Sequence, residues 1–181
     1  DYHIEIVGAD VFPQGYAAIF DKLTDMNGIT MMCDIGNGTM NLMKIVNHKP
    51  DLKNMFTEKF GTHQCTLAVR ESMMRTHHVN IDDAIITDIL CTGTANINGK
   101  YLETIISTVK EYTKGIFDRL KARDYDPESM NLYVTGGGGC LIKNFADIDR
   151  ITVNEDICAN AKGFEFMAYQ KMIRGRYDVL K

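Results

Sequence analysis

An aspartate, two glycines and a threonine lie close together between two apolar stretches of the chain. Asp34 ends the first stretch, and Gly36, Gly38 and Thr39 precede the second. Glycines permit positive φ and close approach to the backbone, whose N–H groups can then cradle an anion. A carboxylate for a hydrated cation, beside amides and a hydroxyl for phosphate oxygens, is the set of groups that phosphoryl chemistry uses. The alternative is an ordinary hairpin turn, because Asn37-Gly38 is by itself a strong hairpin signal.

The second candidate site is a run of four consecutive glycines, Gly136, Gly137, Gly138 and Gly139. The run lies between a predicted strand and a predicted helix, where open α/β sheets bind ligands. It would permit close approach of a flat ring or a phosphate, and a helix start favours anions. A turn that needs positive φ would explain one or two glycines, but it explains four poorly. Lys143, one helical turn later, could reach a ligand or only cover the helix end.

Two further residue types could carry chemistry. Gln14 follows a proline at a predicted helix start, and its side-chain amide could hold a water molecule, although such a glutamine is usually a surface residue. The cysteines are widely spaced and show no C-x-x-C pair, so we expect buried thiols and neither a zinc site nor a redox dithiol. They are Cys33, Cys65, Cys91, Cys140 and Cys158.

The composition is that of a globular chain of 181 residues, with 24% charged and 45% apolar residues. This length fits one domain. The net charge of -4 gives no general attraction to nucleic acid or anionic membranes. No apolar run approaches the length of a bilayer span, so we expect a cytoplasmic protein with no membrane partner. The chain begins at Asp1 without a methionine, and we interpret it as a fragment.

Periodicity and turn signals divide the chain into alternating strands and helices. The predicted strands are residues 2–7, 29–34, 40–46, 52–60, 130–135 and 151–153. The predicted helices are residues 14–23, 62–77, 81–90 with Asn80 as its cap, 102–120, 140–145 and 157–173. Strands 29–34, 40–46 and 52–60 form a meander, with the last nearer an edge. The order predicts an α/β fold with a mixed sheet.

These motifs, in this order, resemble those of a known superfamily. The D-x-G-x-x-T-x-N motif at residues 34–41 and the later strand-T-G-G-G-G-helix motif resemble the second half of an actin-like or Hsp70-like ATPase. The resemblance covers essentially the whole chain and implies a ribonuclease-H-like mixed sheet flanked by helices. Segments 11–18 and 159–164 are most similar to the bacterial plasmid-segregation actins of the ParM type.

The resemblance implies ATP and Mg²⁺ as ligands, held between two domains. Asp34 would hold the magnesium ion through water, and Gln14 would orient the attacking water. The implied nucleotide-binding residues are Gly36, Asn37, Gly38, Thr39, Asn41, Gly136, Gly137, Gly138, Gly139 and Lys143. Asn41 departs from the pattern, because many relatives have an aspartate there. No second D-x-G-x-x hairpin is present in the sequence, so the first domain would be missing, with residues 1–24 and 157–181 connecting to it.

The implied function is that of an ATP-binding domain of a filament-forming ATPase for plasmid DNA segregation. Partners implied in the same way are further copies of the full-length protein and a DNA-bound adaptor protein. We expect ATP hydrolysis in the full-length parent and an inactive isolated fragment, whose small-residue stripe at 159–163 would be exposed. The alternatives are half of a cell-division actin or of a sugar or acetate kinase, and a non-enzymatic interaction scaffold with the same fold.

Overall fold

The structure is a computed structural model that describes residues 3, 5, 8–9 and 11–179 of the chain. The strand expected at residues 2–7 falls largely outside the described residues. Within the described part, no helix has both the length and the apolar content needed to cross a membrane.

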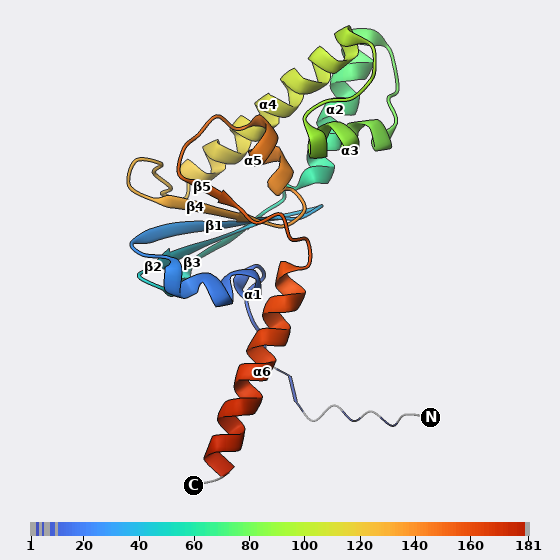
Figure 1. The fold of residues 1–181 in the computed structure, drawn as a ribbon. Coiled ribbons are helices and arrows are strands. Elements are labelled where there is room, and N and C mark those ends of the chain that lie inside the picture. The colour runs from blue at the N-terminus through green and yellow to red at the C-terminus, as the bar shows by residue number, and fades with distance from the viewer. Residues whose placement is uncertain (1–2, 4, 6–7, 10, 180–181) are drawn as a thin grey trace.

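A mixed five-stranded sheet forms the centre of the molecule (Figure 1). Its strands, in the spatial order β3-β2-β1-β4-β5, are Lys49–Glu58, Met40–Val46, Ile29–Ile35, Asn131–Thr135 and Ile151–Val153. β1 pairs antiparallel with β2 and parallel with β4, while β2 and β3 pair antiparallel and β4 and β5 parallel. The α/β class, the mixed sheet and the edge position of the third meander strand are confirmed.

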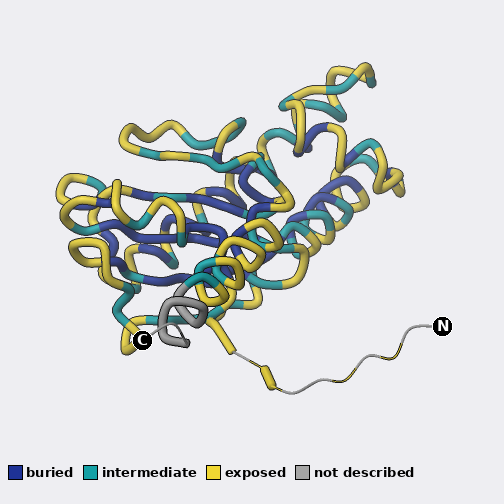
Figure 2. The backbone as a smooth tube through the Cα atoms, turned by 60° about the horizontal axis from the view of Figure 1, so that its bottom comes forward, coloured by how far each residue is buried: buried dark blue, intermediate teal, exposed yellow. Residues whose placement is uncertain are grey.

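Four helices cover one face of the sheet or extend from its end (Figure 1). They are α2 Thr62–His77, α3 Asp83–Thr92, α4 Gly99–Lys121 and α5 Gly139–Phe145. Alternate residues of β1, including Met31, Cys33 and Ile35, point into the large apolar core beneath these helices. Figure 2 shows this buried strand interior beneath exposed loops and helix faces. The core depends on long-range packing that joins helices to strands far apart in the sequence.

Several helix boundaries differ from the sequence prediction, including those of α3 and α4. The cap of α3 is Asp82, which accepts a hydrogen bond from the Ala84 N–H at 2.8 Å, and Asn80 lies outside the helix. Asp82 acts as the cap because its carboxylate accepts a hydrogen bond from the second N–H of the helix. α4 begins earlier than expected, after the cap Asn98, which accepts from the Lys100 N–H.

The opposite face carries α1 Tyr16–Ile19, the 3₁₀ helix η1 Phe20–Asp25 and α6 Ala159–Val179. The single helix expected at residues 14–23 is wrong: Gly15 has φ 82°, which interrupts the helix before Tyr16, and the last part is 3₁₀. A smaller apolar cluster lies here, with Ile19 of α1 against Met32 and Met43 of the sheet. α6 then projects away from the sheet (Figure 1).

The small-residue stripe of α6 is used within the chain. Gly163 lies so close to Ala17 that a Cβ at Gly163 would overlap the Ala17 carbonyl. Ala159 is also buried, whereas Ala161 is exposed. The expectation of a fully exposed stripe is therefore wrong, because α1 packs against it.

The cysteines also differ from expectation. Cys33 and Cys65 are buried thiols, as predicted. Cys91 and Cys158 are exposed and Cys140 is half-buried, because these three lie near helix ends and not in the core.

Candidate functional site

The Asp34 carboxylate lies at the end of β1, on the face covered by α1 and α6. Asp34 is only 3% exposed. Two glycines make room for it: a Cβ at Gly15 would lie 3.1 Å from the Asp34 Cβ, and a Cβ at Gly136 would lie 2.5 Å from Oδ1. The turn before α1 and the glycine loop after β4 therefore both close on this carboxylate.

Strand register extends the site into a row of polar side chains. Asp34 pairs with Asn41 on β2 and with Thr135 on β4, and paired residues project from the same face of a sheet. Asn41 pairs in turn with Thr57 on β3, whose hydroxyl donates to Asn41 Oδ1 at 2.8 Å. Asn160 of α6 covers the row, with Nδ2 3.5 Å from Asp34 Oδ2. We call Thr57, Asn41, Asp34 and Thr135, with Asn160 above them, the polar row.

Three polar atoms beside Asp34 have no hydrogen-bond partner among the described residues: Asn41 Nδ2, Thr135 Oγ1 and Asn160 Oδ1. Asn41 and Thr135 are more than nine-tenths buried. A buried polar atom without a partner costs about 1–3 kcal/mol, so such atoms normally meet water or a ligand. Thr135 Oγ1 and Asn160 Oδ1 can accept hydrogen bonds from the water shell of a cation beside this carboxylate, whereas Asn41 Nδ2 is a donor and suits a water or phosphate oxygen.

Burial also acts on the charge of this carboxylate. Desolvation raises the pKa of Asp34, and the hydrogen bond from Asn160 offsets part of the rise. A nearby cation would favour the ionised form. Among the described residues, no cluster of three or more His, Cys, Asp or Glu side chains could hold a metal directly. The donor set therefore fits a cation held through water, with Asp34 supplying the charge.

The next part of the site is the backbone of the hairpin between β1 and β2. The Gly36 N–H donates to the Thr39 carbonyl at 2.8 Å, while the N–H groups of Asn37, Gly38 and Thr39 have no partner within the described chain. Neither Asn37 nor Gly38 has positive φ, so the turn is not the usual type I′ Asn-Gly turn. The hairpin thus presents three neighbouring donors, which suits an anion.

The start of α2 fixes this hairpin. The Thr62 and His63 N–H groups donate to the carbonyls of Gly36 and Asn37, at 3.1 and 2.8 Å. A Cβ at Gly61 would overlap the Asn37 backbone, so glycine is needed there for close approach. The carbonyls of Gly36 and Asn37 therefore face α2. The N–H groups of residues 37–39 take no part in these contacts.

The four glycines have different roles. A Cβ at Gly138 would overlap Ile35, and one at Gly136 would crowd Asp34; Gly136 also has φ 85°. The Gly138 N–H donates to the Ile35 carbonyl at 2.8 Å and ties this loop to the end of β1. Only Gly137, of the four, has open space at its Cβ position. The loop is thus packed on its own chain, and its free side is at Gly137.

Gln14 and Lys143 lie at the edge of the candidate site. Gln14 is exposed in the turn before α1, next to Gly15, which contacts Asp34. Lys143 Nζ pairs with Glu155 at 2.7 Å, and both side chains are about half exposed or more. Thr57, Thr135 and Asn160 were not among the predicted site residues. Thr135, directly before the glycine run, and Asn160, within the ParM-like segment 159–164, lie in motifs that the sequence showed, whereas Thr57 does not.

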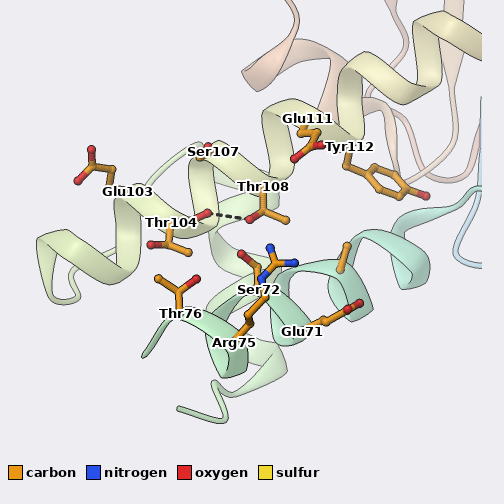
Figure 3. Close-up of a pocket in the computed structure, with 11 residues that line it drawn as sticks. Glu71, Ser72, Arg75, Thr76, Glu103, Thr104, Ser107, Thr108, Glu111 and Tyr112 are labelled. Atoms are coloured by element: carbon orange, nitrogen blue, oxygen red, sulfur yellow. Dashed lines mark hydrogen bonds between the residues drawn. The ribbon is translucent and has the colours of Figure 1, made fainter. Parts of the chain in front are cut away.

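A separate polar groove of about 670 Å³ lies between α2 and α4 (Figure 3). Glu71 and Arg75 of α2 and Glu103, Thr108 and Glu111 of α4 line it. None of the predicted site residues lines this groove.

Neither a protein-family model nor a curated protein sequence matches the chain. Solved structures match the chain by fold. The chain has the fold of one domain of actin-like proteins. The archaeal actin homolog Ta0583 aligns with TM-score 0.69 and 16% identity, over 88% of this chain and 55% of that one.

Two ParM structures align in the same way. The pCBH ParM non-polymerisable quadruple mutant has TM-score 0.66 and 17% identity, over 88% of this chain and 54% of that one. Bacillus thuringiensis ParM with ATP has TM-score 0.58 and 8% identity, over 81% and 48%. The chain thus spans about half the length of the structures it matches.

Proposed function

We propose that the chain is a nucleotide-binding domain of an actin-like ATPase, with Mg²⁺ and the phosphates of ATP bound beside Asp34. The observation that carries the proposal is the polar row. In it, a buried carboxylate is flanked by polar atoms that have no partner in the described part of the chain, where the hairpin and the glycine loop meet. Matched structures contain nucleotides, among them the archaeal actin homolog with ADP and Bacillus thuringiensis ParM with ATP.

Each element would have a separate binding role. The free N–H groups of residues 37–39 would bind β- and γ-phosphate oxygens, with the Thr39 hydroxyl beside them. The open side at Gly137 would admit the adenosine. Lys143 would have to leave Glu155 in order to contact a ligand. Ligand binding by Lys143 therefore depends on release of this ion pair with Glu155.

The polar row would serve to place water. A bound magnesium ion would neutralise charge on the phosphates. Asp34 and Asn160 would hold water molecules in a fixed position, and Gln14 would orient the attacking water from the turn before α1. Such placement contributes without any covalent step by the protein.

Hydrolysis, filament assembly, plasmid segregation and recruitment of a DNA-bound adaptor belong to our proposal for a longer parent protein in the cytoplasm. They rest on the fold and on the ParM-type segments 11–18 and 159–164. A site open to water on one side screens its charges, so the chain by itself should turn over ATP no faster than background. ATP turnover by residues 1–181 that depends on magnesium would contradict this part.

Calorimetric titration of the chain tests the binding proposal. ATP with magnesium should bind more tightly than ATP with a chelator. In Asp34→Asn this magnesium-dependent gain should disappear, whereas Asp118→Asn, on an exposed position of α4, should keep it. Equal affinities with and without magnesium in the unaltered chain would contradict the proposal. Phosphorylation of an added sugar would favour the kinase alternative instead.

A further inference from the structure

Two cysteines lie on α3 and α5, which pack against each other. Cys91 is in the last turn of α3 and is exposed, and Cys140 is at the start of α5 and is half-buried. Asn144 Nδ2 donates to the carbonyls of Leu90 and Cys91, at 3.0 and 2.9 Å. Cys140 and Asn144 are four residues apart and share a face of α5. That face therefore packs on the end of α3 that carries Cys91.

Cys91 is close enough to Cys140 to act on its thiol. The neighbouring Cys91 raises the pKa of Cys140. Cys140 Sγ also donates to the Gly137 carbonyl at 3.3 Å. Cys140 thus connects α3 with the one glycine of the loop that has an open side.

The two sulfurs differ in access. Burial and the neighbouring Cys91 raise the pKa of Cys140 to about 11. Cys91 is exposed, so a reagent in solution meets it first. An exposed thiol beside a more buried thiol is the arrangement of an attacking thiol and a resolving thiol.

We propose that Cys91 and Cys140 form a dithiol site that a small disulfide of the glutathione type oxidises to an intramolecular disulfide. The Cys91 thiolate attacks the small disulfide, forming a mixed disulfide and releasing one small thiol. Cys140 then loses its proton to solvent and attacks Cys91 Sγ, which releases the second small thiol. Two protein thiols are oxidised and one small disulfide is reduced to two thiols.

The new bond would tie the end of α3 to the start of α5. The Gly137 carbonyl would lose the S–H donor of Cys140, because the sulfur no longer carries a proton. If the proposed nucleotide site is correct, oxidation would also change access at Gly137. The dithiol chemistry itself does not depend on nucleotide binding.

Peptide mapping after incubation with oxidised glutathione tests the proposal without any nucleotide. In the native chain, Cys91 and Cys140 should appear in one linked peptide pair, and the linkage should be lost on reduction. Cys158 is exposed on a different segment and serves as an internal control, since it should carry only a glutathionyl group. Cys91 found as a mixed disulfide beside a free Cys140 would overturn the proposal.

Single substitutions sharpen the assignment. Cys140→Ser should stop the reaction at the mixed disulfide on Cys91, and Cys91→Ser should leave Cys140 unmodified for much longer. Cys65, which is fully buried near Cys140, offers another partner, so Cys65→Ser should leave the linkage unchanged. A linkage between Cys65 and Cys140 would contradict the pairing.

The pH dependence of disulfide closure distinguishes a preformed pair of thiols from two thiols that react only because they are exposed. Because Cys140 must deprotonate, closure of the mixed disulfide should accelerate by roughly tenfold per pH unit between neutral pH and about pH 9. Asn144→Ala should slow closure several-fold, because the side chain that holds α3 against α5 is gone. A closure rate independent of both pH and Asn144 would argue against a preformed pair.

Discussion

The two faces of the sheet differ in what they bury, and β1 belongs to both. On the α2–α5 face its residues Met31, Cys33 and Ile35 join the large hydrophobic cluster. On the α1–α6 face, Met32 lies in a small apolar cluster and Asp34 in the polar row. Alternation along a single strand therefore places apolar side chains in the large core on one face and the Asp34 carboxylate among polar side chains on the other. We expect substitutions on the two faces to differ in size and in sign.

The largest loss should follow truncation in the apolar face. Ile105→Ala removes a fully buried side chain of α4 and leaves a cavity, so the free energy of unfolding should fall by about 3 kcal/mol. Urea unfolding measures this. Leu52→Ala on the edge strand, where the side chain is 68% exposed, should change it by less than about 0.5 kcal/mol. Equal losses would contradict the placement of the core.

The next effect separates two adjacent glycines. Gly138→Ala would drive a Cβ into Ile35 and should cost about 2 kcal/mol by overpacking, although its φ of -82° is ordinary. Gly137→Ala, in open space, should be nearly neutral for stability. Thermal unfolding of both variants checks the pair. A neutral Gly138→Ala would show that the loop does not pack on β1 as described.

A smaller effect of opposite sign is expected in the polar row. Thr135→Val keeps the shape of the side chain and removes a buried hydroxyl that has no partner among the described residues. The free energy of unfolding should stay the same or rise by up to about 1 kcal/mol. A loss as large as that of Ile105→Ala would mean that Thr135 has a structural partner. Affinity for ATP with magnesium should weaken in the same variant.

The smallest effect is a pH slope. Because the pKa of Asp34 is raised, the folded chain holds this proton more tightly than the unfolded chain does. The free energy of unfolding should therefore decrease as the pH rises from the ordinary value of 3.8 through the raised pKa. Asp34→Asn should remove this decrease and be more stable above that window in the absence of magnesium.

Asp51→Asn is the control for this slope. Hydrogen bonds from Asn54 and the Lys53 N–H lower the pKa of Asp51, so its contribution is lost as the pH falls. The two variants should change the acid limb of the unfolding curve in opposite directions. A change in the same direction would contradict the burial of Asp34.

Local pattern predicted much of the fold. The apolar period over α4, the apolar run of β1 and the glycine run after β4 each lie within one element, and the structure has all three elements at about the expected positions. The α/β class and the edge position of β3 followed from the order of these elements. Predictions failed where one residue overrides a pattern, as Gly15 does by ending the turn before α1 in a left-handed conformation.

The sequence by itself determined that an aspartate and two glycine-rich turns stand at strand ends. Only the tertiary structure decided what surrounds that aspartate, because Asn41, Thr135 and Asn160 reach it through strand register and helix docking. The closeness of Cys91 to Cys140 likewise depends on how α3 packs against α5. Periodicity reports which face of an element is buried, whereas a site is made by contacts between elements, and those are set by packing of the whole chain.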